Sequence, residues 1–298
     1  ERNWSFSPNT SLILSENAPP MESIYFLIND KIKDKYSLEI FNGKTKNSPK
    51  NHNSKFLGFR IVTSPVKNLK IELLQTSQWG GSEYSESMSA LSGAILMDTN
   101  DGKNSNINKM AGFGISYLIE NKIIPFKLYA QLIGEDEAGS LPSCYIYMSG
   151  IESKFLNGTS LKKLGLEFID TRVKKTEHGY CGPNTAYNNG IYKYTNNNLV
   201  LGAPIDTEGT SIEIYGENKL NESLSIKYSI KKAIINDSNW NGHRLSAMRE
   251  TGLIKYLSIV FKKDGKRISS NIYQQGIALN KANYTNKIGV GFTASLDF

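Results

Sequence analysis

The last 15 residues of the chain, YTNKIGVGFTASLDF (284–298), alternate between apolar side chains and small or polar ones. The even positions carry Tyr284, Ile288, Val290, Phe292, Ala294, Leu296 and Phe298. Only Asn286 breaks the pattern. Because successive side chains of a β-strand point to opposite faces, this stretch predicts a strand with one apolar and one polar face. Soluble β-sandwiches and membrane-spanning β-barrels both contain such strands.

The same alternation recurs along the chain and predicts 13 strands. We expect them at 24–32, 35–42, 55–64, 68–78, 110–120, 124–135, 144–156, 162–173, 209–219, 222–235, 252–263, 266–276 and 284–298. We also expect a short helix at 86–96, although Gly93 weakens it.

Short and long connections alternate between these strands. The short ones are 33–34, 65–67, 121–123, 157–161, 220–221 and 264–265. The long ones are 43–54, 79–109, 136–143, 174–208, 236–251 and 277–283. In an up-and-down meander every second connection lies at the same end, as in outer-membrane barrels with short periplasmic turns and long extracellular loops. The pattern predicts an all-β, transmembrane, antiparallel up-and-down barrel with extracellular loops and a periplasmic C-terminus.

Composition agrees with this prediction. The chain contains no run of about 18 uncharged apolar residues, so no transmembrane helix is predicted. The charge of +7 favours an anionic neighbour such as lipopolysaccharide or an acidic glycan. The lysines are scattered, which argues against nucleic acid. We expect Phe298 to be an assembly signal for the barrel-assembly machinery, and an odd number of strands suggests that an N-terminal part precedes this sequence.

Five segments resemble the Wzi family of capsule-assembly proteins. They are SLILSENAPP (11–20), TSQWGG (76–81), LYAQLIGEDEAGSLPS (128–143), LEFIDT (166–171) and YNNGIYKY (187–194). The resemblance covers roughly the C-terminal three-fifths of such proteins. It implies a barrel of about 18 strands that holds capsular polysaccharide in a lectin-like manner and is not an enzyme. The chain departs from the family at Trp4-Ser5-Phe6-Ser7-Pro8, where members carry a Trp-Gly-Pro-Gly-like run.

Two of these segments contain the most specific motifs. The motif residues are Gln78, Gly80 and Gly81 in the first and Gly134, Glu135, Asp136 and Glu137 in the second. The acidic cluster is either a site for a cation or sugar hydroxyls, or a strand end whose acids pair with Lys or Arg, and we favour the structural interpretation. A glycosidase would need two converging carboxylates, whereas neighbouring residues on a strand diverge.

The long loops contain the best candidates for carbohydrate binding, because aromatic rings stack on sugars and Arg binds carboxylates. These candidates are Trp79, Tyr84, Tyr180, Tyr187, Tyr192, Asp206, Trp240 and Arg244. The alternative is that some of the aromatic residues form membrane girdles or fill the barrel interior.

Other reactive residues predict no catalysis. The histidines, His52, His178 and His243, lie in predicted loops without metal spacing, and we expect them to be exposed. No G-x-S-x-G motif supports a hydrolase. The chain therefore predicts no catalytic residue, metal or cofactor. Cys144 and Cys181 either form one disulfide or remain apart.

The leading hypothesis is a single, monomeric barrel domain over 1–298 that binds or organises surface polysaccharide at the outer membrane. The alternative is a diffusion channel for small polar solutes or oligosaccharides, lined by Lys70, Glu72, Lys227 and Lys231. A surface lipid or glycan hydrolase is the third and weakest hypothesis.

Overall fold

The computed structural model describes residues 3–30, 35–46, 53–96, 106–122, 124–138, 141–157, 160–176, 181–264, 266–282 and 287–296. It divides into two compact units. Unit 1 comprises Glu1–Tyr117, Tyr129–Met148 and Asp170–Glu208, and unit 2 comprises Leu118–Leu128, Ser149–Ile169 and Gly209–Phe298. The single domain expected for 1–298 stays a prediction.

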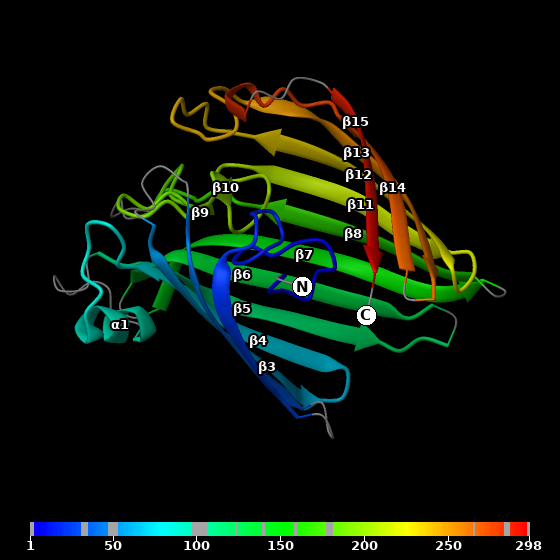
Figure 1. Cartoon of the computed structure of the whole chain (residues 1–298), viewed down its shortest axis with the longest axis horizontal. Coiled ribbons are helices and arrows are strands. Elements are labelled where there is room, and N and C mark those ends of the chain that lie inside the picture. Colours follow the sequence, from blue (N-terminus) through cyan, green and yellow to red (C-terminus); the bar gives the residue numbers. More distant parts are fainter. Residues whose placement is uncertain are drawn as a thin grey trace. The chain divides into compact units, whose positions relative to one another are not determined.

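Thirteen strands form one sheet in which neighbours in sequence are neighbours in space (Figure 1). They are β1 (Glu22–Asn29), β2 (Tyr36–Lys44), β3 (Lys55–Val66), β4 (Leu69–Trp79), β5 (Asn108–Ile119), β6 (Phe126–Ala138), β7 (Leu141–Asn157), β8 (Ser160–Asp170), β11 (Thr210–Lys219), β12 (Leu224–Ile235), β13 (Glu250–Lys263), β14 (Lys266–Gln275) and β15 (Lys287–Leu296). A second sheet pairs β9 (Thr195–Asn196) with β10 (Leu199–Val200). The helices are α1 (Met88–Ile95) and the short η1 (Asn280–Ala282).

The predicted strands and the helix at 86–96 are confirmed, with two differences. The connection expected at 136–143 is shorter, because β6 continues to Ala138 and β7 begins at Leu141. Strands β9 and β10 were not predicted, since two residues are too few to show alternation. Phe298 lies outside the described residues. No described helix is long and apolar enough to cross a membrane.

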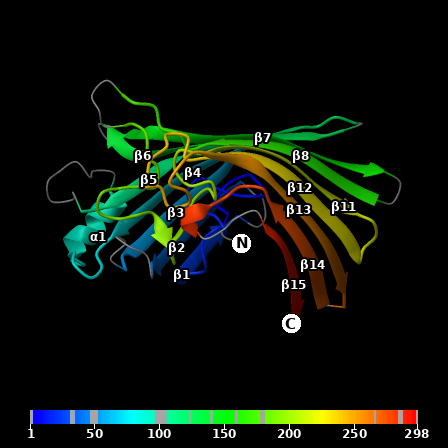
Figure 2. The same ribbon diagram turned by 90° about the horizontal axis from the view of Figure 1, so that it is seen from above.

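The strands of unit 1 have two different faces, as β4 shows. Glu72, Leu74, Thr76 and Gln78 are buried, whereas Leu73 between them is 56% exposed. We call the side of the even β4 residues the covered face and the other side the open face. The N-terminal segment, residues 3–21, lies on the covered face, inside the curve of the unit-1 strands (Figure 2).

Trp4 anchors this segment to the sheet. Its side chain is 2% exposed, and its ring lies directly over the Cα of Gly58 on β3. A Cβ atom at position 58 would lie 2.7 Å from Cη2 of Trp4, so the ring fits only because position 58 has no side chain.

We expect Gly58→Val to displace the Trp4 ring and loosen the N-terminal segment. Limited proteolysis should then cut within residues 3–21, and Trp emission should shift to longer wavelength. Gly291→Val is the matched control, because a Cβ there meets only one atom, at 3.9 Å. Equal protease resistance of the two variants would contradict this packing.

Candidate functional site

The N-terminal segment has no strand, yet its polar backbone is paired. Trp4 N donates to the carbonyl of Leu14 at 2.8 Å, and Ser11 Oγ donates to the carbonyl of Trp4 at 2.7 Å. Ser5 Oγ donates to the carbonyl of Thr10 at 2.5 Å. Short hydroxyl side chains thus hold the turns where no ladder exists, as Ser and Thr commonly do in irregular segments.

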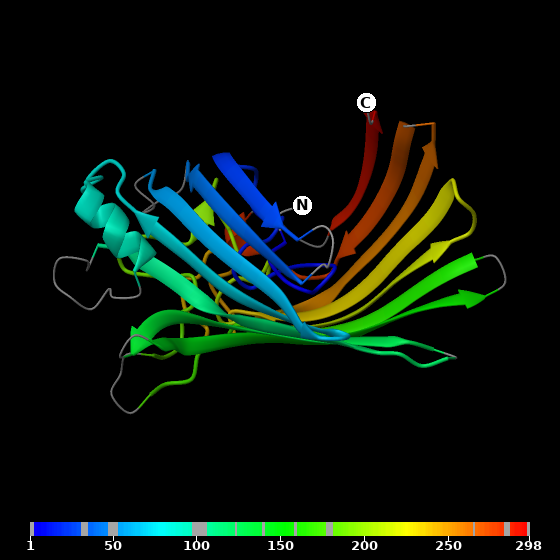
Figure 3. The same cartoon turned by 90° about the horizontal axis from the view of Figure 1, so that it is seen from below.

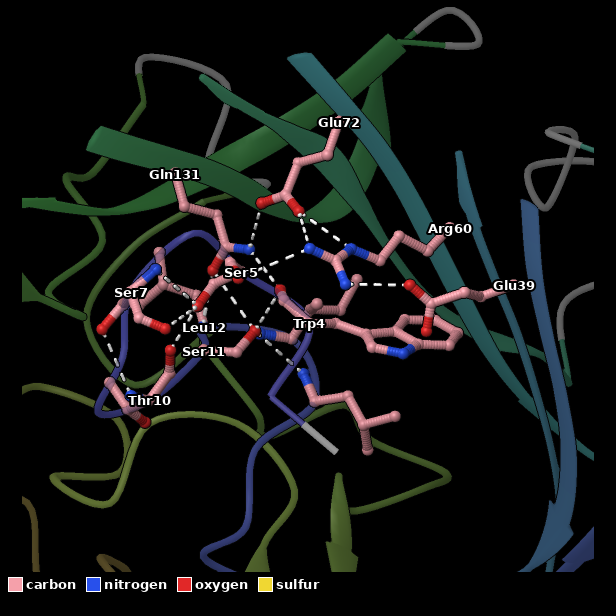
Figure 4. A network of polar contacts seen from close by, with 12 residues as sticks. Trp4, Ser5, Ser7, Thr10, Ser11, Leu12, Glu39, Arg60, Glu72 and Gln131 are labelled. Atoms are coloured by element: carbon pink, nitrogen blue, oxygen red, sulfur yellow. Dashed lines mark hydrogen bonds and ion pairs between the residues drawn. The ribbon is translucent and has the colours of Figure 1, made fainter. Parts of the chain in front are cut away.

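A buried ionic network lies beneath this segment (Figure 4). Arg60 donates through Nε and Nη2 to Oε2 of Glu72, at 2.9 and 2.7 Å, and through Nη1 to Oε1 of Glu39 at 2.9 Å. The Glu72 side chain is fully buried and that of Arg60 is 12% exposed. One guanidinium therefore links strands β2, β3 and β4 on their covered face.

Gln131 on β6 connects that network to the N-terminal segment. Its Nε2 donates to Oε1 of Glu72 at 3.2 Å and to the carbonyl of Trp4 at 2.6 Å. Its Oε1 accepts from the backbone N of Leu12 at 2.8 Å. Both ends of the amide are used, so the side chain fixes the segment in one position.

Three tyrosines of the 171–208 loop are buried in unit 1, and two of them contact the N-terminal segment. Tyr187 and Tyr194 donate their hydroxyls to the carbonyls of Leu12 and Ile13, at 2.6 and 2.7 Å. Tyr192 donates to the carbonyl of Gly80 at 2.8 Å. All three side chains are fully buried, and burial raises the pKa of Tyr192 and Tyr194 above the ordinary value for tyrosine.

The loop itself is fixed at several points. Cys181 forms a disulfide with Cys144 of β7, which answers the question left open by the sequence. Oε1 of Glu208 accepts from the backbone N of Asn184 at 3.0 Å, and Tyr187 N donates to Oε2 of Glu135 at 2.9 Å. Glu135 thus has a structural contact, while the side chains of Asp136 and Glu137 lie outside the described part of the chain.

The QWGG motif joins the same interior. Gln78 is fully buried, donates to the carbonyl of Lys193 at 3.1 Å and accepts from Nδ2 of Asn108 at 3.1 Å. Gly80 and Gly81 have φ of 63° and 98°, a region that favours glycine. Gly134 of the second motif lets the Ser143 backbone approach, because a Cβ would lie 2.6 Å from that carbonyl oxygen.

Trp79 points to the open face, away from the interior. Its side chain is 5% exposed and is covered by α1, with Ala94 and Ile107 in the same cluster. The Lys55 ammonium lies 5.0 Å from the ring centroid and forms an ion pair of 2.7 Å with Glu86. This ion pair lowers the pKa of the Glu86 carboxyl.

The structure therefore corrects half of the predicted carbohydrate candidates. Trp79, Tyr187, Tyr192 and Asp206 are buried, so a polymer outside the protein does not reach them. Their aromatic rings pack in the interior, and the Asp206 carboxylate accepts from the backbone N of Thr207 at 2.7 Å. Tyr84, Trp240 and Arg244 are partly exposed and remain candidates. Tyr180 lies outside the described residues.

The loop between β12 and β13 in unit 2 presents two of the remaining candidates. Asn236, which is fully buried, donates to the carbonyls of Trp240 and Ser246, at 2.9 and 3.0 Å. Its Oδ1 accepts from the backbone N of Trp240 at 2.8 Å. One side chain thus holds both arms of the loop, and Trp240 and Arg244 stay partly exposed on it.

His243 corrects a further prediction, that the histidines are exposed. It is fully buried, and its Nδ1 accepts from the backbone N of Leu245 and Ser246, at 3.1 and 3.4 Å. His52 and His178 lie outside the described residues. Within the described ranges, no group of three or more His, Cys, Asp or Glu side chains could hold a metal ion.

Sequence reasoning missed the residues that organise both regions: Trp4, Arg60, Gln131 and Asn236. Gln131 could have been selected from the sequence, because it is the one residue with a polar amide side chain in the apolar stretch LYAQLI (128–133). The sequence evidence for Asn236 is weaker: Asn at the end of an apolar strand often begins a turn.

We expect Arg60→Leu to lower the free energy of unfolding by about 3–5 kcal/mol, because it leaves the carboxylate of Glu72 buried without a partner. The double variant Arg60→Leu/Glu72→Gln should recover part of that loss. Guanidinium unfolding in detergent micelles, followed by heat-modifiable gel mobility, measures both. Arg249→Leu is the control: its pair with Asp237 is 47% and 25% exposed, so the cost should stay below about 1 kcal/mol. Identical costs for the two single variants would refute the network's role.

Comparisons with known proteins agree with the fold. The solved structure of Wzi from Escherichia coli, described as an outer membrane protein involved in group 1 capsule assembly and a carbohydrate-binding β-barrel, superposes with a TM-score of 0.78 at 22% identity. The superposition covers 98% of this chain and 64% of that one. Acinetobacter baumannii OccAB4 superposes with a TM-score of 0.53 at 8% identity, over 95% of this chain and 69% of that one. The predicted all-β, antiparallel, outer-membrane barrel fold is confirmed.

A sequence relative and a family model match as well. An uncharacterized 55.8 kDa protein in the cps region of Klebsiella pneumoniae is 31% identical over 122 residues, which cover 40% of this chain and 24% of that protein. The chain therefore spans less than two thirds of the length of either relative. Residues 1–270 match the family described as capsule assembly protein Wzi. The predicted resemblance is confirmed: the chain belongs to the Wzi family of capsule assembly proteins.

Proposed function

We propose that this chain is part of an outer-membrane barrel that binds or organises surface polysaccharide through its loops, without catalysing a reaction. The observation that carries the proposal is the β12–β13 loop, in which Asn236 holds Trp240 and Arg244 partly exposed on a fixed backbone. A carbohydrate-binding barrel of the same family supports it.

The loop has the chemistry that a sugar polymer needs. An indole ring stacks on the C–H face of a pyranose, and a guanidinium matches the carboxylate of a uronic acid. Because the loop is already ordered, little conformational entropy is lost on binding. A repeating polymer offers many copies of the same epitope, so weak contacts add through effective concentration.

Strands of both units expose apolar side chains on the face opposite their buried residues, which suits a membrane. In unit 1 they carry exposed apolar residues, including Leu73, Phe113 and Ile115 at 56%, 47% and 42% exposure. In unit 2, Ile259 and Phe261 are 48% and 43% exposed. Outer-membrane lipid and lipopolysaccharide are the partners that cover such faces, with the long loops extracellular and the C-terminus periplasmic. Assembly by the barrel-assembly machinery and a monomeric state belong to the same proposal.

The polar interior supports attachment over diffusion. The covered face of unit 1 is filled by the N-terminal segment and the 171–208 loop. In unit 2, Lys127, Lys154 and Lys163 lie within 3.4, 3.6 and 3.0 Å of the buried Glu152 carboxylate, and Lys231 pairs with Glu213 at 2.9 Å. The Lys231–Glu213 pair is neutral and attracts a passing anion only weakly, whereas the three lysines that share the Glu152 carboxylate keep a net positive charge. The filled covered face of unit 1 is therefore what opposes diffusion.

Conductance in planar bilayers distinguishes the proposed function from the channel alternative. We expect the protein to produce no steady conductance, because side chains fixed by buried hydrogen bonds occupy the covered face. Arg60→Leu, which weakens the hold on the N-terminal segment, should produce intermittent openings. Stable, large conductance of the unmodified protein would favour the channel.

We expect Trp240→Ala to weaken binding of purified capsular polysaccharide from the source strain by about 2- to 10-fold, the range that one aromatic contact provides. Arg244→Gln should weaken binding of an acidic polymer more than that of a neutral one. Surface plasmon resonance on the immobilised polymer measures both. Met248→Ala, which removes a 55% exposed side chain from the same loop, is the control.

Two results would count against the proposal. One is unchanged affinity in both loop variants, which would place the sugar elsewhere. The other is unchanged cell-attached glycan after deletion of the gene in a strain shown to make capsule.

A further inference from the structure

Helix α1 is uncharged and exposes large apolar side chains. Residues 87–96, SMSALSGAIL, contain no Asp, Glu, Lys or Arg. Ser87 caps the helix by accepting from the backbone N of Ala90 at 3.3 Å. Met88, Ile95 and Leu96 are 78%, 44% and 63% exposed. Exposure of three large apolar side chains to water, on one short helix and its C-cap, is unfavourable. We therefore expect this surface to be covered.

The other side of the helix is fixed to the sheet. Gly93 and Ala94 are buried, and Ala90 and Leu91 pack against the cluster that contains Trp79. Gln75 Nε2 donates to the carbonyls of Ala94 and Ile95, at 3.2 and 3.1 Å, and Ser77 Oγ donates to the carbonyl of Ala94 at 2.6 Å. Two strand side chains therefore satisfy the last carbonyls of the helix.

These contacts place the helix on the open face of β4. Gln75, Ser77 and Trp79 have the parity of the exposed Leu73, whereas Thr76 and Gln78 face the covered side. Figures 2 and 3 show α1 on the side of β4 away from the N-terminal segment. On the open face of β4, Leu73 is therefore exposed, whereas Gln75, Ser77 and Trp79 contact α1.

We propose that α1 lies at the membrane surface, with Met88, Ile95 and Leu96 inserted among lipid acyl chains at the end of the barrel wall. The inference rests on the proposed membrane location. Continuity supports it: Gln75, which donates to the carbonyl of Ile95, follows the exposed Leu73 on the open face, so the end of the helix lies beside the exposed apolar side chains of that face. Both groups of exposed apolar side chains need the same surroundings. An exposed apolar helix surface is buried favourably at the boundary between headgroups and acyl chains.

The test uses nitroxide labels on single introduced cysteines in the full chain, reconstituted in phospholipid nanodiscs. The native cysteines are joined as a disulfide, so only the new thiol reacts. Met88→Cys and Leu96→Cys report on the helix. Leu73→Cys is the reference for the wall, and Ser238→Cys, in the exposed β12–β13 loop, is the reference for water.

At positions 88 and 96, we expect oxygen to relax the label more strongly than a water-soluble nickel chelate does, as at position 73 and opposite to position 238. Water-like values at 88 and 96 with lipid-like values at 73 would overturn the helix proposal alone. Protection from both reagents at 88 and 96 would also overturn it, because a protein partner would then cover the helix. Water-like values at 73 as well would overturn the membrane location on which the proposal rests.

Discussion

Pairing of buried charge on the covered face of unit 1 is the constraint on which the rest depends. The Arg60 guanidinium and the Glu72 carboxylate are stable there only together, since either one alone would be a buried charge without a partner. Glu72 also accepts from Gln131, and Gln131 uses its remaining donor and acceptor on Trp4 and Leu12. A segment without regular structure is thereby held in place by side chains, where a strand would be held by a ladder of backbone hydrogen bonds.

The tyrosines of the 171–208 loop complete this arrangement for a physical reason. The carbonyls of Leu12 and Ile13 belong to no sheet, and a buried carbonyl without a donor is costly. Tyr187 and Tyr194 supply a donor at the end of a large apolar ring, so each fills space and satisfies a carbonyl at once. Because the described interior of unit 1 is filled in this way, the polymer contacts that we propose fall to surface loops such as that of Trp240.

The sequence predicts the sheet better than the site. Alternation is local, so strand positions follow from single stretches such as 284–298. Tyrosine chemistry is the same in a sugar site and in a protein interior, and only long-range contacts separate Tyr187 and Tyr192 from the more exposed Tyr84. Trp79 could have been assigned by parity, because it lies on the opposite face of β4 from Gln78. The distance between Cys144 and Cys181 has no local signal at all.

Departures from alternation carry information of their own. An apolar open face should continue along β4, yet Gln75 and Ser77 place polar groups on it. Each has a partner, because α1 ends where its carbonyls meet them. Lys55 on β3 follows the same rule: it lies over the Trp79 ring and pairs with Glu86, just ahead of the helix. Polar residues on the open face thus mark the part of the strand that the protein itself covers. The rest of that face exposes apolar side chains, which require apolar surroundings. In a barrel of this kind, that boundary is where the wall ends and the loops begin.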